Sequence, residues 1–182
     1  MVQFADLWRN HPINKSVITP CIAPTDLKNL EGEAIRKNYP VFPHQCAVRM
    51  GVCLHRSGVT VEQLPGLATC NVHPREQMHF INASSFADVL ARSNISGVGK
   101  VERITGKDVA EYYPKLIGRT GLIYFRDYWY RSGDKPGQPT GDHMDLWNGY
   151  RTTAKFLLEW FSWLGYYSNY AGGKEIWFWP VE

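Results

Sequence analysis

The sequence predicts an α+β fold in which helices pack against a small antiparallel sheet. Helical periodicity and capping patterns occupy the first part of the chain, and β-rich runs with one late helix occupy the second. The 182 residues, of which 44% are hydrophobic, suffice for one substantial core and are too few for two ordinary domains. We therefore expect residues 1–182 to form a single domain.

Residues 1–42 contain four prolines and little periodicity, so we expect extended or turn-rich chain around one short helix. A helix is predicted over 44–57, with Pro43 suited to its first turn and a stop at Ser57-Gly58. Its small and apolar residues recur at helical spacing: Ala47, Met50, Gly51 and Leu54.

Two capping patterns predict two further short helices. Ser85-x-x-Asp88 places one near 86–93, and Thr105-x-x-Asp108 places the other near 106–113. Pro114 is expected to close the second helix.

Three β-rich runs follow: GLIYFRDYWY from Gly121, DHMDLW from Asp142, and the C-terminal EIWFWPV. A Gly/Pro-rich loop from Arg131 to Gly141 separates the first two runs. A late helix is predicted from one apolar face: Phe156, Leu157, Trp160, Phe161 and Leu164. Most tryptophans in this half are expected to be buried, namely Trp147, Trp160, Trp163, Trp177 and Trp179.

Composition and charge exclude several classes of protein. The 20 Lys and Arg against 17 Asp and Glu leave a net charge of +3 with interleaved signs, so nucleic acid is not an expected partner. An aromatic content of 14% argues against disorder. No apolar run is long enough to span a membrane, and the N-terminus lacks the features of a secretory signal. We expect neither membrane insertion nor export by a cleaved leader.

Cys46 is the first candidate for chemistry, because it falls in the opening turn of a predicted helix. Unpaired amides and the helix dipole favour a negative charge there, and the thiolate is the nucleophilic form of cysteine. His143, in a predicted strand after the Gly/Pro-rich loop, is the candidate base. His44 is a weaker candidate, since residues at i and i+2 of a helix do not face each other.

Metal and cofactor sites are not expected. Cys70-x-x-His73 and Cys53-x-His55 contain ligand types, but no second paired motif completes a set of four. His55, His73 and His79 otherwise have no special context. No glycine-rich phosphate-binding pattern is present, so a nucleotide is not expected either.

Four motifs resemble, in order, the fourth family of type VI secretion amidase effectors. They are HQCAVRMG around Cys46, IGRTGLIYF, GDHMDLWNG around His143, and the terminal EIWFWPV, and they extend from about residue 43 to the C-terminus. The resemblance implies a papain-like fold of the NlpC type and a catalytic Cys46–His143 pair. It implies an antibacterial toxin that hydrolyses the amide bond between D-glutamate and meso-diaminopimelate in peptidoglycan stem peptides.

The same resemblance implies the partners and the place of action. A contractile secretion apparatus would carry the protein from the producer's cytoplasm into the periplasm of a target cell. A cognate immunity protein would protect the producer by occluding the cleft. No cofactor is implied.

The third catalytic residue departs from the family pattern. The segment after the Leu-Trp-Asn-Gly turn, YRTTAKFLLEWFSW, contains no Asp. The candidates for this residue are Asp145, Asn148 and Glu159, and a plain Cys/His dyad without a third residue is a further alternative. We select Asp145, which lies on the same strand face as His143, although side chains at i and i+2 of a strand stand roughly 7 Å apart. The family's C-terminal cysteine pair is also missing, so pairing among Cys21, Cys53 and Cys70 stays open.

Two alternatives remain at this point. One is a papain-like cysteine hydrolase with another amide substrate. The other is a non-catalytic module that binds glycan or a partner protein, which predicts Cys46 and His143 buried apart from each other.

Overall fold

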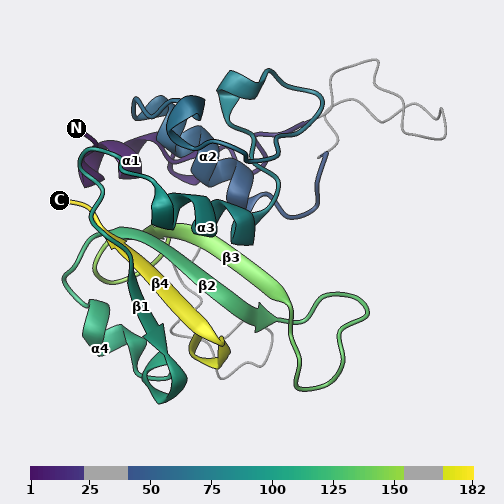
Figure 1. The fold of residues 1–182 in the computed structure, drawn as a ribbon, viewed down its shortest axis with the longest axis vertical. Coiled ribbons are helices and arrows are strands. Elements are labelled where there is room, and N and C mark those ends of the chain that lie inside the picture. Colours follow the sequence, from purple (N-terminus) through teal and green to yellow (C-terminus); the bar gives the residue numbers. More distant parts are fainter. Residues whose placement is uncertain (23–40, 154–169) are drawn as a thin grey trace.

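A four-stranded antiparallel sheet forms the centre of the fold, and helices α1 to α3 cover one of its faces (Figure 1). The structure, a computed structural model, describes residues 1–22, 41–153 and 170–182. Within these ranges the strand order is β1-β4-β2-β3, and every neighbouring pair is antiparallel. The predicted α+β class is confirmed. The elements are α1 (Phe4–Asn10), α2 (Cys46–Arg56), α3 (Ala83–Arg92), α4 (Tyr112–Leu116), β1 (Glu102–Thr105), β2 (Gly121–Trp129), β3 (Gly141–Trp147) and β4 (Glu175–Pro180).

The three β-rich runs form β2, β3 and β4, as predicted. Strand β1 was not predicted. It has only four residues, ERIT, three of them exposed, so it lacks the apolar alternation by which a half-buried strand is recognised. Pairing with β4 makes this segment a strand.

Helix α2 matches the prediction at its end but not at its start. It begins at Cys46, because Gln45 has a non-helical backbone with φ −115° and ψ 24°. Pro43 therefore lies before the helix and not in its first turn. The helix ends at Arg56, with Ser57 as its cap.

Both capping predictions need correction. Helix α3 starts at Ala83, and its cap is Asn82, whose side chain accepts a hydrogen bond from the Ser85 N–H at 2.8 Å. The predicted helix 106–113 is instead a 3-10 turn over Gly106–Val109 followed by α4. Pro114 lies in the first turn of α4, where an N–H has no intrahelical acceptor, so it does not close the helix.

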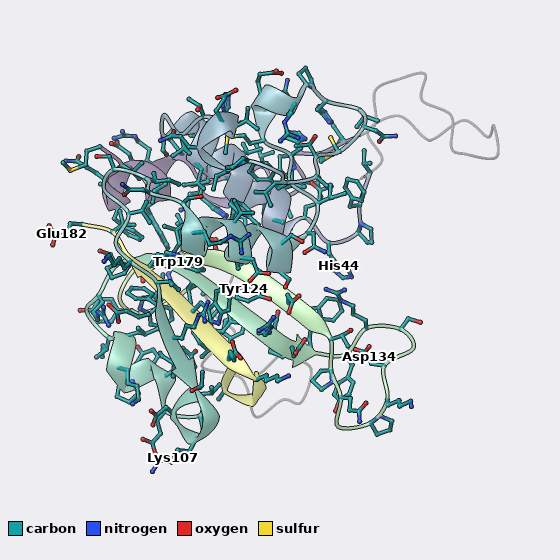
Figure 2. The ribbon with its side chains drawn as sticks, viewed as in Figure 1. His44, Lys107, Tyr124, Asp134, Trp179 and Glu182 are labelled. Carbon is teal, nitrogen blue, oxygen red and sulfur yellow. The ribbon has the colours of Figure 1, made fainter. Side chains whose placement is uncertain are left out.

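Hydrophobic cores lie on both faces of the sheet, as the two-residue period of strands requires. On the side of α1 to α3, Tyr124 and Trp179 are buried between the strands and the helices (Figure 2). On the other side, Ile123 and Phe178 pack with α4. Burial is confirmed for Trp147, Trp177 and Trp179. The predicted late helix, with Trp160 and Trp163, lies outside the described residues.

The two ends of the chain meet beside the sheet (Figure 1). The Phe4 N–H donates to the Glu182 carbonyl at 2.8 Å. The expected short N-terminal helix is α1, which a 3-10 turn over Pro12–Lys15 follows. In the described ranges, no helix is long and apolar enough to cross a membrane.

Candidate active site

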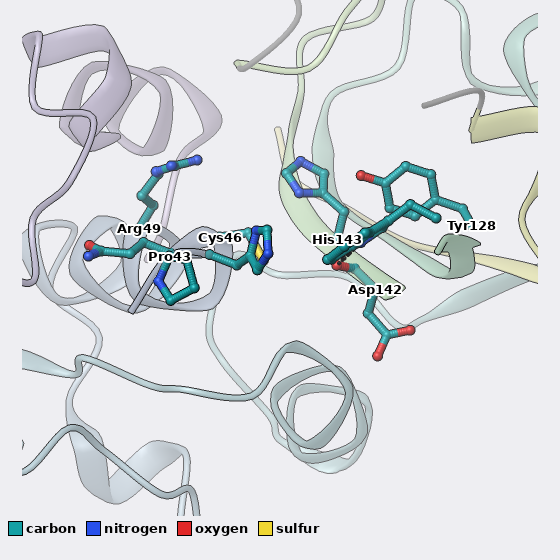
Figure 3. A pocket seen from close by; sticks show the side chains of 9 residues that line it. Pro43, Cys46, Arg49, Tyr128, Asp142 and His143 are labelled. Atoms are coloured by element: carbon teal, nitrogen blue, oxygen red, sulfur yellow. Dashed lines mark hydrogen bonds between the residues drawn. The ribbon is translucent and has the colours of Figure 1, made fainter. Parts of the chain in front are cut away.

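The N-terminus of α2 and strand β3 bring Cys46 and His143 together (Figure 3). Cys46 is the first residue of α2 and is half-buried, and the His143 side chain is 13% exposed. The two side chains are close enough for each to shift the pKa of the other. A non-catalytic module predicts them buried apart, so this contact argues against that alternative.

The surroundings of Cys46 favour its thiolate. Burial acts to raise the pKa of this thiol, but the hydrogen bond and the charge of His143 outweigh it, and the net pKa is lowered. The backbone N–H groups of Met144 and Ala47 also stabilise the negative charge. The Ala47 amide belongs to the helix N-terminus, and Met144 lies on β3, the last strand in the sheet order. Backbone N–H groups from both the edge strand β3 and the N-terminus of α2 therefore stabilise the Cys46 thiolate.

Asp145 orients His143 from two residues along the same strand face. Its Oδ2 lies 3.3 Å from Nε2 of His143, much closer than the strand spacing alone suggested. Because Nε2 interacts with Asp145, Nδ1 is the ring nitrogen left for the thiol. Burial acts to lower the pKa of His143, but the bonds to Asp145 and Cys46 raise it to about 9. Burial likewise acts to raise the pKa of Asp145, but the hydrogen bond from His143 leads the contacts that lower it well below its usual range.

Further groups hold the Asp145 carboxylate, which is itself buried. Its Oδ1 accepts hydrogen bonds from the Leu146 N–H at 2.8 Å and from the Thr153 hydroxyl, and Nε2 of His11 lies 3.7 Å away. Burial lowers the pKa of His11 to about 4, so that imidazole is neutral at pH 7. Sequence reasoning missed His11 and Thr153, because neither lies in a motif that points to β3.

An aromatic stack fixes the plane of the His143 ring. Tyr170 stacks on it with ring centroids 5.8 Å apart and planes 14° apart. Tyr170 stacks in turn on Phe125, at 3.7 Å and 9°. Tyr170 was also missed, since its contact with β3 is not visible in the local sequence.

Cys46 lies between two adjoining hollows of about 250 Å³ and 440 Å³, which together form a cleft. Both are lined by His44 and Trp129, whose rings are 4.7 Å apart. Gly141 permits the close approach of Trp129, because a Cβ at this position would lie 2.3 Å from the indole ring. Arg49 lines the smaller hollow and Arg131 the larger one. The open space beside the thiol is thus lined by aromatic rings, by two guanidinium groups and by Asp142, which lies 3.8 Å from Arg131.

The other candidates for the site occupy different places. The Asn148 side chain accepts the N–H groups of Tyr150 and Arg151 in a turn, and Glu159 lies outside the described residues. His55 is exposed. Cys53 is buried and donates to the Leu7 carbonyl at 3.2 Å.

All four cysteines are free thiols in this structure. The expectation that His73 and His79 have no special context is wrong, because their rings lie 4.2 Å apart beside Cys21 and Cys70.

A helix-borne cysteine that meets a histidine and an aspartate from an antiparallel sheet is the arrangement of papain-like hydrolases of the NlpC type. Comparison with known families agrees with this class. The family model described as "Type VI secretion system (T6SS), amidase effector protein 4" (Tae4) matches residues 42–179. The chain belongs to this family of antibacterial peptidoglycan amidases, and the predicted membership is confirmed.

Solved structures show the same fold. Tae4 from Salmonella typhimurium, in its Tae4/Tai4 effector–immunity structure, is 15% identical over 100% of this chain and 99% of that one, with a TM-score of 0.61. Tae4 from Enterobacter cloacae is 15% identical over 100% and 98% of the two chains, with a TM-score of 0.58. No match is found among curated proteins.

Proposed function

We propose that the protein cleaves the bond between D-glutamate and meso-diaminopimelate in peptidoglycan stem peptides, with Cys46 as nucleophile, His143 as acid and base, and Asp145 as the positioning residue. The observation that carries the proposal is the series Cys46–His143–Asp145 beside an open cleft, in which Cys46 interacts with His143 and His143 is hydrogen-bonded to Asp145. A nucleophile, a base and a group that orients the base are the requirements of covalent amide hydrolysis.

The reaction proceeds in two halves. The Cys46 thiolate attacks the amide carbonyl, and the protonated His143 gives its proton to the departing amine, which leaves an acyl-enzyme thioester. His143, now neutral, takes a proton from water, and the resulting hydroxide attacks the thioester. The free carboxylate product leaves, and the thiolate–imidazolium pair is restored.

The oxyanion of each tetrahedral intermediate needs hydrogen-bond donors. The backbone N–H of Cys46 is suited to this role, since the first amides of a helix have no intrahelical acceptor. The Gln45 side chain is not available for this role, because its Nε2 donates to the carbonyls of Cys21 at 2.7 Å and Phe42 at 3.2 Å. We therefore assign the oxyanion contact to the backbone.

The charge of the cleft supports a stem peptide as substrate. Stem peptides carry free carboxylates next to the scissile bond, and guanidinium groups bind carboxylates with charge-assisted hydrogen bonds. Arg49 and Arg131 line the two hollows beside Cys46. Both guanidinium groups also have partners within the protein: Nε of Arg49 donates to the Ile18 carbonyl at 2.8 Å, and Arg131 lies 3.8 Å from Asp142.

Digestion of purified muropeptides tests the reaction and the bond. Wild type is expected to release fragments whose masses assign the cut to the D-glutamyl–diaminopimelate bond. Cys46→Ala should lower the rate by about 10³-fold or more. His55→Ala, which changes an exposed histidine, is the control and should cleave at the wild-type rate.

Two results would contradict the proposal. Cleavage by a folded Cys46→Ala protein at the wild-type rate would remove the nucleophile from the mechanism. A cut at a different amide would select the runner-up, a papain-like hydrolase with another substrate.

The proposed setting follows from family membership and from the neighbouring structures. Tae4 proteins of Salmonella typhimurium and Enterobacter cloacae are found in complex with Tai4 immunity proteins. We infer that this chain is made in the cytoplasm, is delivered by the type VI apparatus, and acts in the target periplasm. A cognate immunity protein would cover the cleft at Cys46.

A further inference from the structure

Four metal-ligating side chains, none of them part of the proposed catalytic series, gather at one point against α2. They are Cys21, Cys70, His73 and His79, and their candidate ligand atoms all lie within 4.8 Å of one another. Nδ1 of His73 is 3.3 Å from Sγ of Cys70 and 3.6 Å from Sγ of Cys21. Val48 and Val52 of α2 pack against the two cysteines. We name Cys21, Cys70, His73 and His79 the Cys2His2 cluster.

We propose that the Cys2His2 cluster binds one Zn²⁺ ion as a structural site with four protein ligands. Tetrahedral zinc with Zn–S of about 2.3 Å and Zn–N of about 2.0–2.1 Å places neighbouring ligand atoms about 3.4–3.8 Å apart. The two measured S–N separations, 3.3 and 3.6 Å, lie at or near this range. Two thiolates and two imidazoles form one of the usual ligand sets of structural zinc. Four protein ligands leave no open position, so the ion would stabilise the fold and take no part in hydrolysis.

The backbone already holds three of the ligands in one loop. The Cys70 N–H donates to the His79 carbonyl at 3.0 Å, so these two residues face each other across a narrow loop. The next residues outward, Thr69 and Phe80, form an antiparallel bridge. His73 lies within the loop, three residues after Cys70. The site is therefore largely organised before any ion arrives.

This loop lies unusually close to α2. A Cβ at Gly51 would come within 1.9 Å of the Met78 carbonyl oxygen, so only glycine allows the observed contact. Met78 itself has a φ of 54°, in the left-handed region that favours glycine. A strained residue and an obligatory glycine indicate that the position of the loop is specified closely.

A bound cation would give a buried polar atom of the Cys2His2 cluster a partner that the protein alone does not supply. Among the described residues, Nδ1 of His79 is one of the few buried side-chain atoms without a hydrogen-bond partner, and binding to a metal would satisfy it. Zinc would bind both cysteines in the thiolate form.

A Cys21–Cys70 disulfide is the competing arrangement. It would join two of the four side chains but would leave both imidazoles without a role and Nδ1 of His79 without a partner. Sequence reasoning found only the partial motif Cys70-x-x-His73, because the fourth ligand, Cys21, lies 49 residues before Cys70. Cys53, the other cysteine considered there, is not part of the cluster.

The site would also support the catalytic helix. The Gln45 side chain bonds both backbone groups of Cys21: Oε1 accepts its N–H at 2.8 Å and Nε2 donates to its carbonyl at 2.7 Å. Gln45 directly precedes Cys46. An ion that fixes Cys21 would therefore steady the chain at the start of α2.

The test is metal binding by the full-length reduced protein. After chelation and desalting, the protein is titrated with Zn²⁺ and, separately, with Co²⁺. We expect one Zn²⁺ per chain by elemental analysis, an upward shift of the thermal midpoint on zinc addition, and the absorption of tetrahedral Co²⁺ with thiolate ligands. The readouts do not depend on amidase activity, so failure here would leave the proposed hydrolysis standing.

Variants assign the ion to the cluster. Cys21→Ser and His73→Ala are expected to lose stoichiometric binding, whereas Cys46→Ala and His55→Ala should keep it. The wild-type Co²⁺ spectrum needs no substitution, so it remains decisive if a variant fails to fold. Absence of stoichiometric metal in the folded, reduced wild type would overturn the proposal, as would retention by folded Cys21→Ser. Metal-free protein isolated with a Cys21–Cys70 disulfide would overturn it too.

Discussion

His143 is a largely buried histidine whose two neighbours favour its charged form. Burial alone would make the imidazole neutral, but Asp145 on one side and Cys46 on the other raise its pKa to about 9. The Cys46 pKa is lowered at the same time. Both shifts favour a thiolate–imidazolium pair in the resting site.

The rate of hydrolysis should follow this titration. As the pH rises through about 9, His143 loses the proton that the proposed mechanism gives to the leaving amine, so kcat/KM should fall on the alkaline side. Asp145→Asn removes the negative charge that holds the proton. We expect its alkaline limb to move to lower pH and its kcat/KM to fall by about 100-fold or more.

The pH–rate profile of folded Asp145→Asn separates a positioning role from a merely structural one. Thr153→Val, which removes a hydrogen bond to the same carboxylate but keeps its charge, is the matched control and should leave the alkaline limb closer to that of wild type. An unchanged limb in Asp145→Asn would favour a plain Cys46–His143 dyad.

At the scale of elements, the packing of α2 against the loop at Met78 requires a glycine at position 51. Alanine is normally the better helix former by about 1 kcal/mol. At Gly51, however, the added Cβ would overlap the Met78 carbonyl, and backbone cannot move aside cheaply. We expect Gly51→Ala to lower the free energy of unfolding by about 1–3 kcal/mol.

Urea unfolding checks this expectation. Arg56→Ala introduces the same residue at an exposed position of the same helix, and it should change stability by no more than about 0.5 kcal/mol. A Gly51→Ala protein as stable as wild type would mean that the loop at Met78 can move away from α2.

Residues whose role depends on their own helix or strand could be predicted from the neighbouring sequence. Cys46 and His143 became candidates from their local contexts, a helix start and a strand after a loop, and the family resemblance selected them as a catalytic pair. Asp145 was selected because strand periodicity places it on the same face as His143. The cap of α3 was misassigned to Ser85, since several residues nearby have side chains able to cap and only the backbone geometry selects Asn82.

At the scale of the whole molecule, the missed residues share one property: they act through contacts between distant segments. His11 reaches Asp145 from the N-terminal segment, and Tyr170 stacks on His143 just ahead of β4. Cys21 joins a loop about fifty residues further along. Periodicity and capping rules describe neighbours in sequence, so such contacts become visible only in three dimensions.

Overall stability should depend on pH through His11. Burial keeps this histidine neutral in the folded protein, with a pKa of about 4 against 6.5 when unfolded. The unfolded chain therefore binds one more proton than the folded protein between these values. The free energy of unfolding should fall by about 1.4 kcal/mol per pH unit as the pH drops through this window.

His143 affects the free energy of unfolding on the alkaline side of neutral pH. Its raised pKa stabilises the fold fully below about 6.5, and that contribution is lost as the pH rises towards 9. Urea unfolding from pH 4 to 9 measures both effects. His11→Gln should flatten the acid side, whereas His55→Gln, at an exposed position, should not; equal slopes in His11→Gln and wild type would contradict the assignment.

The meeting of α2 with β3 has a kinetic consequence. Cys46 and His143 are 97 residues apart in sequence (143 − 46), and they belong to elements that touch only after the chain closes this long loop. Contacts of high sequence separation carry the largest loop-closure entropy and form slowly. An incompletely folded chain therefore has a thiol but no imidazole beside it. For an enzyme of this family, the capacity to damage a cell wall arises only with the completion of folding.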